Sequence, residues 1–264
     1  MKTSIITVCL NSAETIEDCI KSVMTQTWPD IEHIIIDGGS TDKTIDIINN
    51  FKGHIAKYIS EPDQGIYDAM NKGIELSSGD VIGILNSDDV YADETTVGRM
   101  VELIQSNCLD AVYADLAYID PRNSDCIKRF WKAGTYKKKA FFFGWAPPHP
   151  TFFCRRKVYE KFGFYRSDMK IAADFELMLR LIEKHQIRIG YLPKVIVKMR
   201  MGGKANVLGG IIRGNLEIIR SFRLNGFSVS PWFFILKPIT KISQYFLRPE
   251  STKSTGLICK DTRT

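Results

Sequence analysis

The residues with the clearest capacity for chemistry are two adjacent carboxylates, Asp88 and Asp89. They follow the apolar run 81–85 and precede a polar loop. Neighbouring acids repel each other, and a divalent cation held through their oxygens would remove that repulsion. The pair is equally compatible with a simpler role, because Asp is a favoured N-cap for a following helix. Both interpretations remain open at the level of this motif.

Other acidic and amide side chains occupy similar places, each directly after an apolar run. They are Asn11, the segments 37–42 and 61–65, Asn86 and Asp115. If these runs are strands of one parallel sheet, their carboxyl ends share an edge, and ligands bind at that edge in such sheets. The spacing therefore predicts one polar site assembled from several loops.

The elements that would position these residues alternate along the first 115 positions. Apolar, β-rich runs predict strands at 4–10, 32–37, 55–60, 81–85 and 111–114, and amphipathic stretches predict helices at 13–26, 44–51, 66–76 and 94–106. Asn11 and Glu14 are spaced as a capping box for the first helix. The alternation predicts an α/β fold with a mostly parallel sheet covered by helices on both faces. Later in the chain, helices are expected near 175–185 and 207–224, and strands at 187–191 and 195–199.

Charge divides the chain into two halves. Residues 1–120 contain 7 Lys and Arg against 21 Asp and Glu, whereas residues 121–264 contain 29 against 9. An acidic half suits a ligand held through a cation, and a basic half suits phosphate or anionic lipid. Segregated solvent-exposed charge is the alternative.

The remaining composition narrows the class of protein. Six cysteines without C-x-x-C spacing exclude a zinc ribbon and a thioredoxin-like motif. The sequence contains no apolar run that approaches the roughly 18 residues of a membrane-spanning helix. We therefore expect a cytoplasmic protein with reduced thiols.

The segments 7–11, 37–42, 61–65 and 85–89 together resemble, in order and in separation, the pattern of glycosyltransferase family 2. The resemblance covers about residues 1–205. It implies a GT-A fold with a Rossmann-like sheet and inverting transfer of a sugar from a nucleotide-diphosphate-sugar, most commonly UDP-linked, to an acceptor hydroxyl. Mn²⁺ or Mg²⁺ is the implied cofactor. The Gln-x-x-Arg-Trp motif of processive synthases does not occur in the sequence, so single-sugar addition is expected.

The same resemblance implies a division of the chain and roles for single residues. Residues 1–115 would bind the nucleotide-sugar and 116–205 the acceptor, followed by an amphipathic helical extension at 206–250 and a flexible tail at 251–264. Asp37 would bind the nucleotide base, Asp88 the ribose and sugar, and Asp89 the metal, while Asn11, Asp63 and Asn86 line the donor pocket. Relatives often have Asp in place of Asn86. The cation would neutralise the diphosphate as it leaves.

Asp174, in the segment 172–177, resembles the catalytic base of the family, which takes the proton from the attacking hydroxyl. Relatives often have Glu immediately before it, where this chain has Ala173, and Glu176 is the alternative base. A helix N-cap is the competing structural role for Asp174. His149 resembles a segment that borders the acceptor site, although a His between prolines more often fixes a loop.

Residues 201–204 resemble a mobile loop that closes over the diphosphate, and Lys204 or Arg200 would contact phosphate there. A plain surface turn is the alternative.

The segment 207–248 mixes apolar and basic residues. Such a mixture suits a helix lying on an anionic membrane surface, here the inner face of the cell membrane. The acceptor would then be a lipid-linked saccharide, such as a polyprenyl-diphosphate sugar in bacterial polysaccharide synthesis (O-antigen, capsule or exopolysaccharide). The other interpretation packs this helix on the domain with Trp232 and Phe233 in the core.

Two rival functions explain less of the sequence. A nucleotidyltransferase would need a Gly-rich, basic phosphate loop after the first strand, and residues 9–14 contain neither Gly nor Lys. A basic module that binds nucleic acid or another polyanion would account for residues 121–264 but leaves the acidic motifs unexplained. Nucleic acid is therefore not an expected partner.

Overall fold

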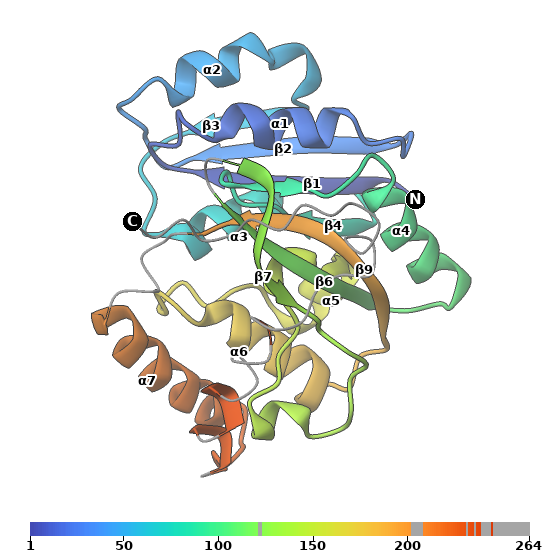
Figure 1. The fold of residues 1–264 in the computed structure, drawn as a ribbon, viewed down its shortest axis with the longest axis vertical. Helices are drawn as coiled ribbons and strands as arrows, with labels where there is room; N and C mark the ends of the chain where they lie inside the picture. Colours follow the sequence, from blue (N-terminus) through green and yellow to red (C-terminus); the bar gives the residue numbers. More distant parts are fainter. Residues whose placement is uncertain (121–122, 202–207, 231, 235, 239–243, 245–264) are drawn as a thin grey trace.

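A computed structural model describes residues 1–120, 123–201, 208–230, 232–234, 236–238 and 244. Lys204 and the segment 251–264 lie outside these residues. The described residues contain one nine-stranded mixed sheet with the order β3-β2-β1-β4-β8-β6-β9-β5, and β7 pairs with β6 (Figure 1). Helices flank this sheet, so the predicted α/β class is confirmed.

The first four strands are parallel: β1 (Thr3–Cys9), β2 (Ile31–Asp37), β3 (Lys57–Ser60) and β4 (Val81–Ile84). Their apolar side chains alternate between two buried faces. Ile6 and Ile34 pack in one cluster with Met70, whereas Ile35 packs in another with Ile20. Strands buried on both faces read as nearly continuous apolar runs, which is why the sequence predicted them well.

The helices of this half are α1 (Ile16–Met24), α2 (Thr44–Asn50), α3 (Ile66–Leu76) and α4 (Thr96–Ser106), and a 3₁₀ turn (Lys52–His54) follows α2. The predicted capping box at the first helix is wrong. Asn11 has a φ of 51°, and its Oδ1 accepts the backbone N–H of Thr41 at 2.9 Å. Thr15, the residue before α1, makes no side-chain cap. Asn tolerates this left-handed conformation, and the side chain is used to join two loops.

The other strands are β5 (Asp89–Tyr91), β6 (Ala111–Asp120), β7 (Asn123–Trp131), β8 (Phe153–Arg155) and β9 (Ile189–Arg200). Strand β8 pairs antiparallel with β4 and β6, β7 with β6 and β5 with β9, whereas β6 and β9 are parallel. Strand β6 is longer than predicted, and the two strands expected near 187–199 are one. Ala114 pairs with Leu192 and Asp115 with Val195, so Pro193 lies in a bulge between them. Because Pro lacks an N–H, it interrupts the hydrogen-bond ladder, and the sequence pattern therefore predicted two strands.

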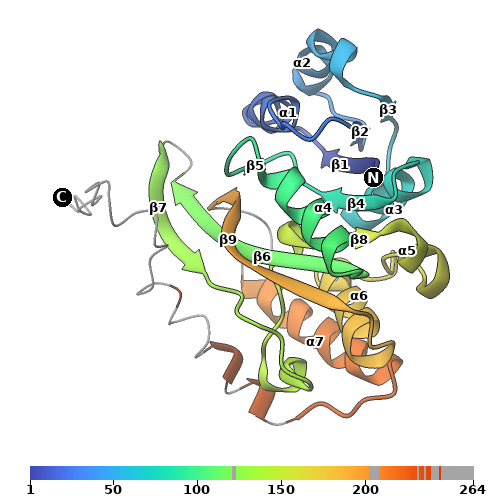
Figure 2. The same cartoon turned by 90° about the vertical axis from the view of Figure 1, so that its right-hand side faces the viewer.

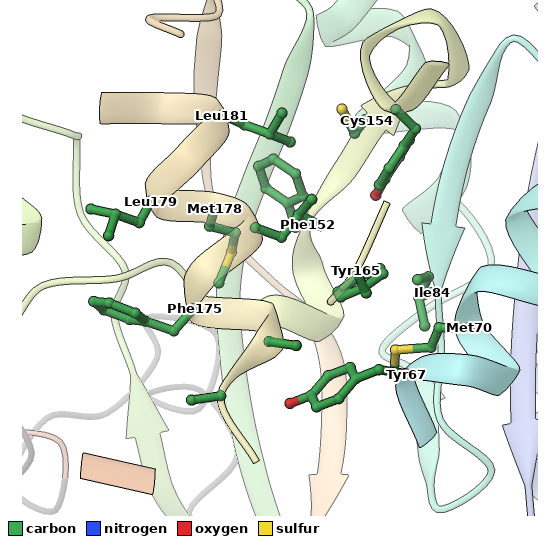
Figure 3. Packing of buried hydrophobic residues seen from close by; sticks show 14 of the residues in the cluster. Tyr67, Met70, Ile84, Phe152, Cys154, Tyr165, Phe175, Met178, Leu179 and Leu181 are labelled. Atoms are coloured by element: carbon green, nitrogen blue, oxygen red, sulfur yellow. The ribbon is translucent and has the colours of Figure 1, made fainter. Parts of the chain in front are cut away.

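The remaining helices are α5 (Arg156–Phe162), α6 (Ala173–Leu179), a π-helical continuation (Arg180–Lys184) and α7 (Leu208–Leu224). Helix α7 lies beside α6 at one end of the molecule (Figures 1 and 2). Phe222 of α7 is buried, with its ring 5.7 Å from that of Phe175 and 5.6 Å from that of Phe233. The core between α3 and α6 contains Tyr67, Tyr165 and Phe175 (Figure 3).

The packing interpretation of the C-terminal segment holds for Phe233 but not for Trp232. Phe233 is buried in the core, as the packing interpretation expects, whereas Trp232 is 58% exposed. The outer face of α7 carries Ile212 and Leu216, which are 58% and 61% exposed. Among the described helices, none is long and apolar enough to cross a membrane.

Candidate active site

The carboxyl ends of β1, β2 and β4 bring three predicted motifs together. The backbone N–H of Asn11 donates to Ser40 Oγ at 2.7 Å, in addition to the bond between Asn11 Oδ1 and Thr41. Ser12 Oγ lies 2.8 Å from Ser87 Oγ. These bonds hold the loops after the three strands against one another, so the predicted polar edge exists.

Asp37 is fully buried beneath the loop that follows β2. Its carboxylate accepts the backbone N–H groups of Gly39 and Ser40 at 3.1 and 3.0 Å, the hydroxyl of Ser60 at 2.6 Å and the hydroxyl of Ser40. Burial would raise the pKa of Asp37, yet these hydrogen bonds outweigh it and hold the pKa below its usual range. The expectation that Asp37 contacts a nucleotide base does not fit this geometry, because its oxygens are engaged in shaping the loop.

Asp63 reaches the same edge from the loop after β3. Its Oδ1 accepts the N–H of Gly65 at 2.8 Å, and a Cβ added at Gly38 would lie only 2.5 Å from its Oδ2. The missing side chain at Gly38 therefore lets the half-buried Asp63 carboxylate cross the end of β2. Asp63 thus lies at the end of β2, on the polar edge.

Asp89 and Asn86 lie in contact beyond the end of β4. Asp89 is fully buried in β5, and its Oδ2 accepts Asn86 Nδ2 at 3.3 Å. Burial first, and then the charge of the half-buried Asp88, raise the pKa of Asp89 well above its usual range. Asp89 Oδ1 and Asn86 Oδ1 are buried with no hydrogen-bond partner among the described residues.

Those two orphaned oxygens are a test of the predicted metal. An unpartnered buried acceptor costs about 1–3 kcal/mol, and carboxylate and amide oxygens are ligands that Mg²⁺ and Mn²⁺ favour. Asp88, Asp89 and Asn86 therefore fit a divalent cation. The described part of the chain contains no cluster of three or more Asp, Glu, His or Cys side chains that could enclose one.

Arg200 joins this acidic loop from the end of β9. Its Nη1 donates to the backbone oxygen of Asp88 at 3.4 Å, and its Nη2 lies 2.5 Å from Oδ2 of Asp18. Strand β9 supplies this position because Met199 pairs with Asp89. Of the two residues expected to contact phosphate, Arg200 is thus placed beside the acidic loop, whereas Lys204 lies outside the described residues.

A second group of polar residues surrounds Asp174 at the start of α6. His149 Nδ1, from the 3₁₀ turn His149–Thr151, lies 3.1 Å from Asp174 Oδ2. The hydroxyl of Tyr67 lies 3.2 Å from Asp174 Oδ1 and 2.8 Å from the backbone oxygen of Ile171. Figure 3 shows Tyr67 on α3 with its hydroxyl directed toward the N-terminal end of α6. The sequence brought Asp174 and His149 to attention separately and missed Tyr67, which reads as a core residue of an amphipathic helix.

His149 and Asp174 each stabilise the charged form of the other. Burial would raise the pKa of Asp174, but the neighbouring His149 and the bond from Tyr67 bring it below its usual range. Burial would lower the pKa of His149, but Asp174, and then Asp89 and Asp88, bring it above its usual range. The pair therefore favours an ionised carboxylate beside a protonated imidazole.

Comparison with known proteins identifies the chain. The family described as Glycosyl transferase family 2 matches residues 4–163. The chain belongs to that family. A PGL/p-HBAD biosynthesis glycosyltransferase of Mycobacterium bovis is 30% identical over 210 residues, which are 78% of this chain and 79% of the relative. The chondroitin synthase of Pasteurella multocida is 28% identical over 69% of this chain and 19% of its own length.

Solved structures confirm the GT-A fold of this glycosyltransferase. S. aureus TarS in complex with UDP-GlcNAc matches with a TM-score of 0.66 at 16% identity, over 98% of this chain and 77% of that one. A mannosyltransferase from Pyrobaculum calidifontis in complex with GDP-Man and Mn²⁺ matches with a TM-score of 0.65 at 18% identity, over 97% and 76%. Identities this low speak for the fold alone. The family membership removes the two rival functions considered from the sequence.

Glu176 does not join the Asp174 group in the glycosyltransferase. It is 2% exposed, with Oε1 3.1 Å from Arg180 Nε and 3.0 Å from Asn225 Nδ2. Arg180 also donates to the backbone oxygen of Phe164 at 2.6 Å. Glu176 therefore ties α6 to α7 and to the turn after α5, and the suggestion that it is the alternative base is corrected by this ion pair.

Glu217 of α7 was not singled out in the sequence, yet it binds the backbone that precedes Asp174. Its carboxylate accepts the backbone N–H groups of Lys170, Ile171 and Ala172 at 3.0, 2.8 and 2.9 Å. Burial would raise the pKa of Glu217, but these three bonds bring it below its usual range. Three charge-assisted hydrogen bonds to this one side chain fix the backbone segment that leads into α6. No local sequence signal marks a contact between residues this far apart.

A cavity of about 440 Å³ opens beside His149 and Asp174. These two residues form one part of its wall, and α7 forms another part. The large apolar side chains on the wall are Trp131, Trp145, Ile171, Phe175, Met178, Ile211, Ile218 and Phe233. His149 and Asp174 thus face a space large enough for a small molecule.

Proposed function

We propose that this glycosyltransferase transfers a single sugar, with inversion, from a nucleotide-diphosphate-sugar to an acceptor hydroxyl, with Mn²⁺ or Mg²⁺ as cofactor. The observation that carries the proposal is the position of His149. It is ion-paired with Asp174, and its pKa also responds to the charges of Asp88 and Asp89. His149 is therefore near both the donor-side acids and the acceptor-side acid. A direct displacement requires the two substrate sites to be this close together.

On the donor side, Asn11, Asp63, Asn86 and Asp88 would line the nucleotide-sugar pocket. Asp89 would hold the cation, with the diphosphate supplying further ligands. When bound, the cation would neutralise the charge that develops on the leaving diphosphate. UDP is the preferred nucleotide because it is the commonest in the family, and the UDP-GlcNAc complex of the TarS neighbour is compatible with that choice.

On the acceptor side, the hydroxyl oxygen would attack the anomeric carbon from the face opposite the diphosphate. The bond from that carbon to the phosphate oxygen breaks, and the hydroxyl proton passes to a carboxylate oxygen of Asp174. The lowered pKa of Asp174 keeps it ionised at neutral pH and ready to accept the proton. Tyr67 and His149 would hold the carboxylate in place through one oxygen each.

The acceptor is proposed to be a lipid-linked saccharide, such as a polyprenyl-diphosphate sugar in bacterial polysaccharide synthesis. The segment 206–250 would rest on the inner face of the cell membrane. The exposed side chains of Ile212, Leu216 and Trp232 support this placement, because apolar groups beside the basic residues of α7 suit an anionic lipid surface.

Thermal stabilisation by UDP, GDP, CDP and dTDP, each with and without Mn²⁺, tests the donor site. We expect one nucleotide to raise the Tm only when Mn²⁺ is present, and we expect Asp89→Asn to abolish the shift. Asp46→Asn is the matched control, since Asp46 is exposed on α2 and away from the loop. A folded protein that responds to no nucleotide would refute the donor assignment.

A further inference from the structure

The cavity beside Asp174 and His149 is short of free polar groups away from that pair. Its other polar side chains are Lys132, Asn215, Lys237 and Gln244. Asn215 Oδ1 accepts Lys237 Nζ at 3.1 Å, and Gln244 Oε1 accepts Arg129 Nε at 2.7 Å. Three of the four are therefore engaged with protein groups. A sugar ring in this space would meet few polar partners for its hydroxyls away from Asp174 and His149, which is unfavourable.

Four aromatic side chains give the same wall its character. Trp131, Trp145, Phe175 and Phe233 all line the cavity, and Phe175 and Phe233 are themselves packed with ring centroids 5.9 Å apart. Aromatic and aliphatic surfaces of this kind bind apolar groups by removing both surfaces from water. The cavity has the volume and composition of a small-molecule site, with its polar pair at one place on the wall.

Two glycines of α7 line the cavity. Gly210 and Gly214 are one helical turn apart. A Cβ added at Gly214 would lie 3.2 Å from Ile171 Cγ2, so this glycine lets α7 pack closely against Ile171. Gly209, beside them, has no atom within 4 Å of an added Cβ and does not line the cavity. The cavity wall also includes Ile211, which is 50% exposed, so it continues onto the apolar outer surface of α7.

We propose that this cavity binds an apolar aglycone, an alkyl or aryl group joined to the part of the acceptor that carries the reacting hydroxyl. The hydroxyl lies at Asp174 and His149, and the apolar group lies between α6, α7 and Trp145. An alkyl group too long for the cavity would leave the cavity past Ile211. This inference rests on the proposed function in one respect, that the Asp174 pair marks the acceptor end. Gly210 sets the size of the group that fits.

The test compares binding of methyl, phenyl and octyl β-D-glucosides to the full chain below the micelle concentration. Trp131 and Trp145 line the cavity, so intrinsic fluorescence reports its occupation. We expect the phenyl and octyl glucosides to bind about tenfold or more tightly than the methyl glucoside. Phenyl and octyl arms distinguish an aryl from an alkyl preference. Equal binding of all three glucosides would overturn the inference, and this comparison needs no variant.

Gly210→Leu fills the cavity, and Gly209→Leu makes the same change one residue away in open space. We expect Gly210→Leu to weaken octyl glucoside binding about tenfold or more and Gly209→Leu to leave it unchanged. If both variants bind like the unaltered chain, the cavity is not the binding place. Binding of UDP with Mn²⁺ is measured in parallel. If the unaltered chain binds no UDP, the proposed function is refuted. If it binds UDP but binds all three glucosides equally, only the proposed aglycone site is refuted.

Discussion

His149 Nδ1 lies 3.1 Å from Asp174 Oδ2, and this contact joins a loop before β8 to the first turn of α6. The two side chains are 28% and 22% exposed, so solvent screens the pair only in part. The raised pKa of His149 and the lowered pKa of Asp174 are two expressions of this one interaction. It therefore has measurable consequences for stability as well as for transfer.

The pair should stabilise the fold within a limited pH range. The contribution of His149, whose folded-state pKa is raised, is complete below about pH 6.5 and is lost as the pH rises through the folded value. The contribution of Asp174 is present above about pH 3.9 and is lost as the pH falls through its lowered value. We expect His149→Gln to reduce the free energy of unfolding by about 1–3 kcal/mol at pH 6 and by less at pH 9.

Urea denaturation at both pH values measures this difference. His33, which is buried with its pKa lowered to about 4, is present in both proteins and cancels in the comparison. A loss of stability that is the same at pH 6 and pH 9 would mean that packing, not charge, accounts for the effect of His149.

Asp174→Asn should separate binding from transfer. The amide keeps the size of the side chain but cannot take a proton at neutral pH, so we expect transfer to fall by about 10²–10⁴. Stabilisation by nucleotide and Mn²⁺ should remain, because the donor acids are untouched. Single-turnover transfer and nucleotide titration on the same protein check both parts. Normal transfer by this variant would place the base elsewhere.

Asp89→Asn should change stability in opposite directions with and without ligand. Without metal, the variant replaces a buried acidic group, one oxygen of which has no hydrogen-bond partner among the described residues, by a neutral amide, and we expect it to be more stable by about 1–3 kcal/mol. With nucleotide and Mn²⁺, the unaltered protein should gain stability and the variant should not. Thermal melts with EDTA and with Mn²⁺ plus nucleotide measure both Tm values. The variant should have the higher Tm in EDTA and the lower Tm with ligand, whereas Asp46→Asn should not show this reversal.

Glu217→Gln should lower kcat while sparing the donor. The loss of charge weakens three bonds to the backbone at residues 170–172, so Asp174 is held less firmly, and we expect about a tenfold fall in kcat with little change in the KM for donor. Glu160→Gln is the control, because Glu160 forms an exposed ion pair with Arg156 within α5. If Glu217→Gln alters only the Tm, its role is confined to stability.

The parts of the fold that the sequence predicted are those with strong local signals. Strands β1, β2 and β4 are buried on both faces, and α3 follows its predicted range of 66–76. Strands β5 and β8 have three residues each and β7 is rich in charge, so no apolar run marks them. The capping box failed because Asn11 bonds to Thr41, which is distant in sequence.

The same distinction holds for the site. Residue types at a strand end singled out Asp88 and Asp89, the family resemblance singled out Asp174 and His149, and the described geometry brings His149 and Asp174 together. The direction of a side chain was beyond the sequence, so Asp37 turned out to face its own loop. Tyr67 and Glu217 escaped notice because their contacts with residues 170–174 join helices far apart along the chain.

Helix α7 holds the backbone before Asp174 through Glu217 and walls the cavity through Gly210 and Gly214. Residues 4–163, which carry the family match, end before both features begin. Under the proposed function, part of the acceptor site therefore lies beyond the segment that the family shares. Mutations that broaden the acceptor range through α7 would disturb the helix that aligns the base, so evolution or engineering of new acceptors should require paired changes at α7 and at residues 170–172.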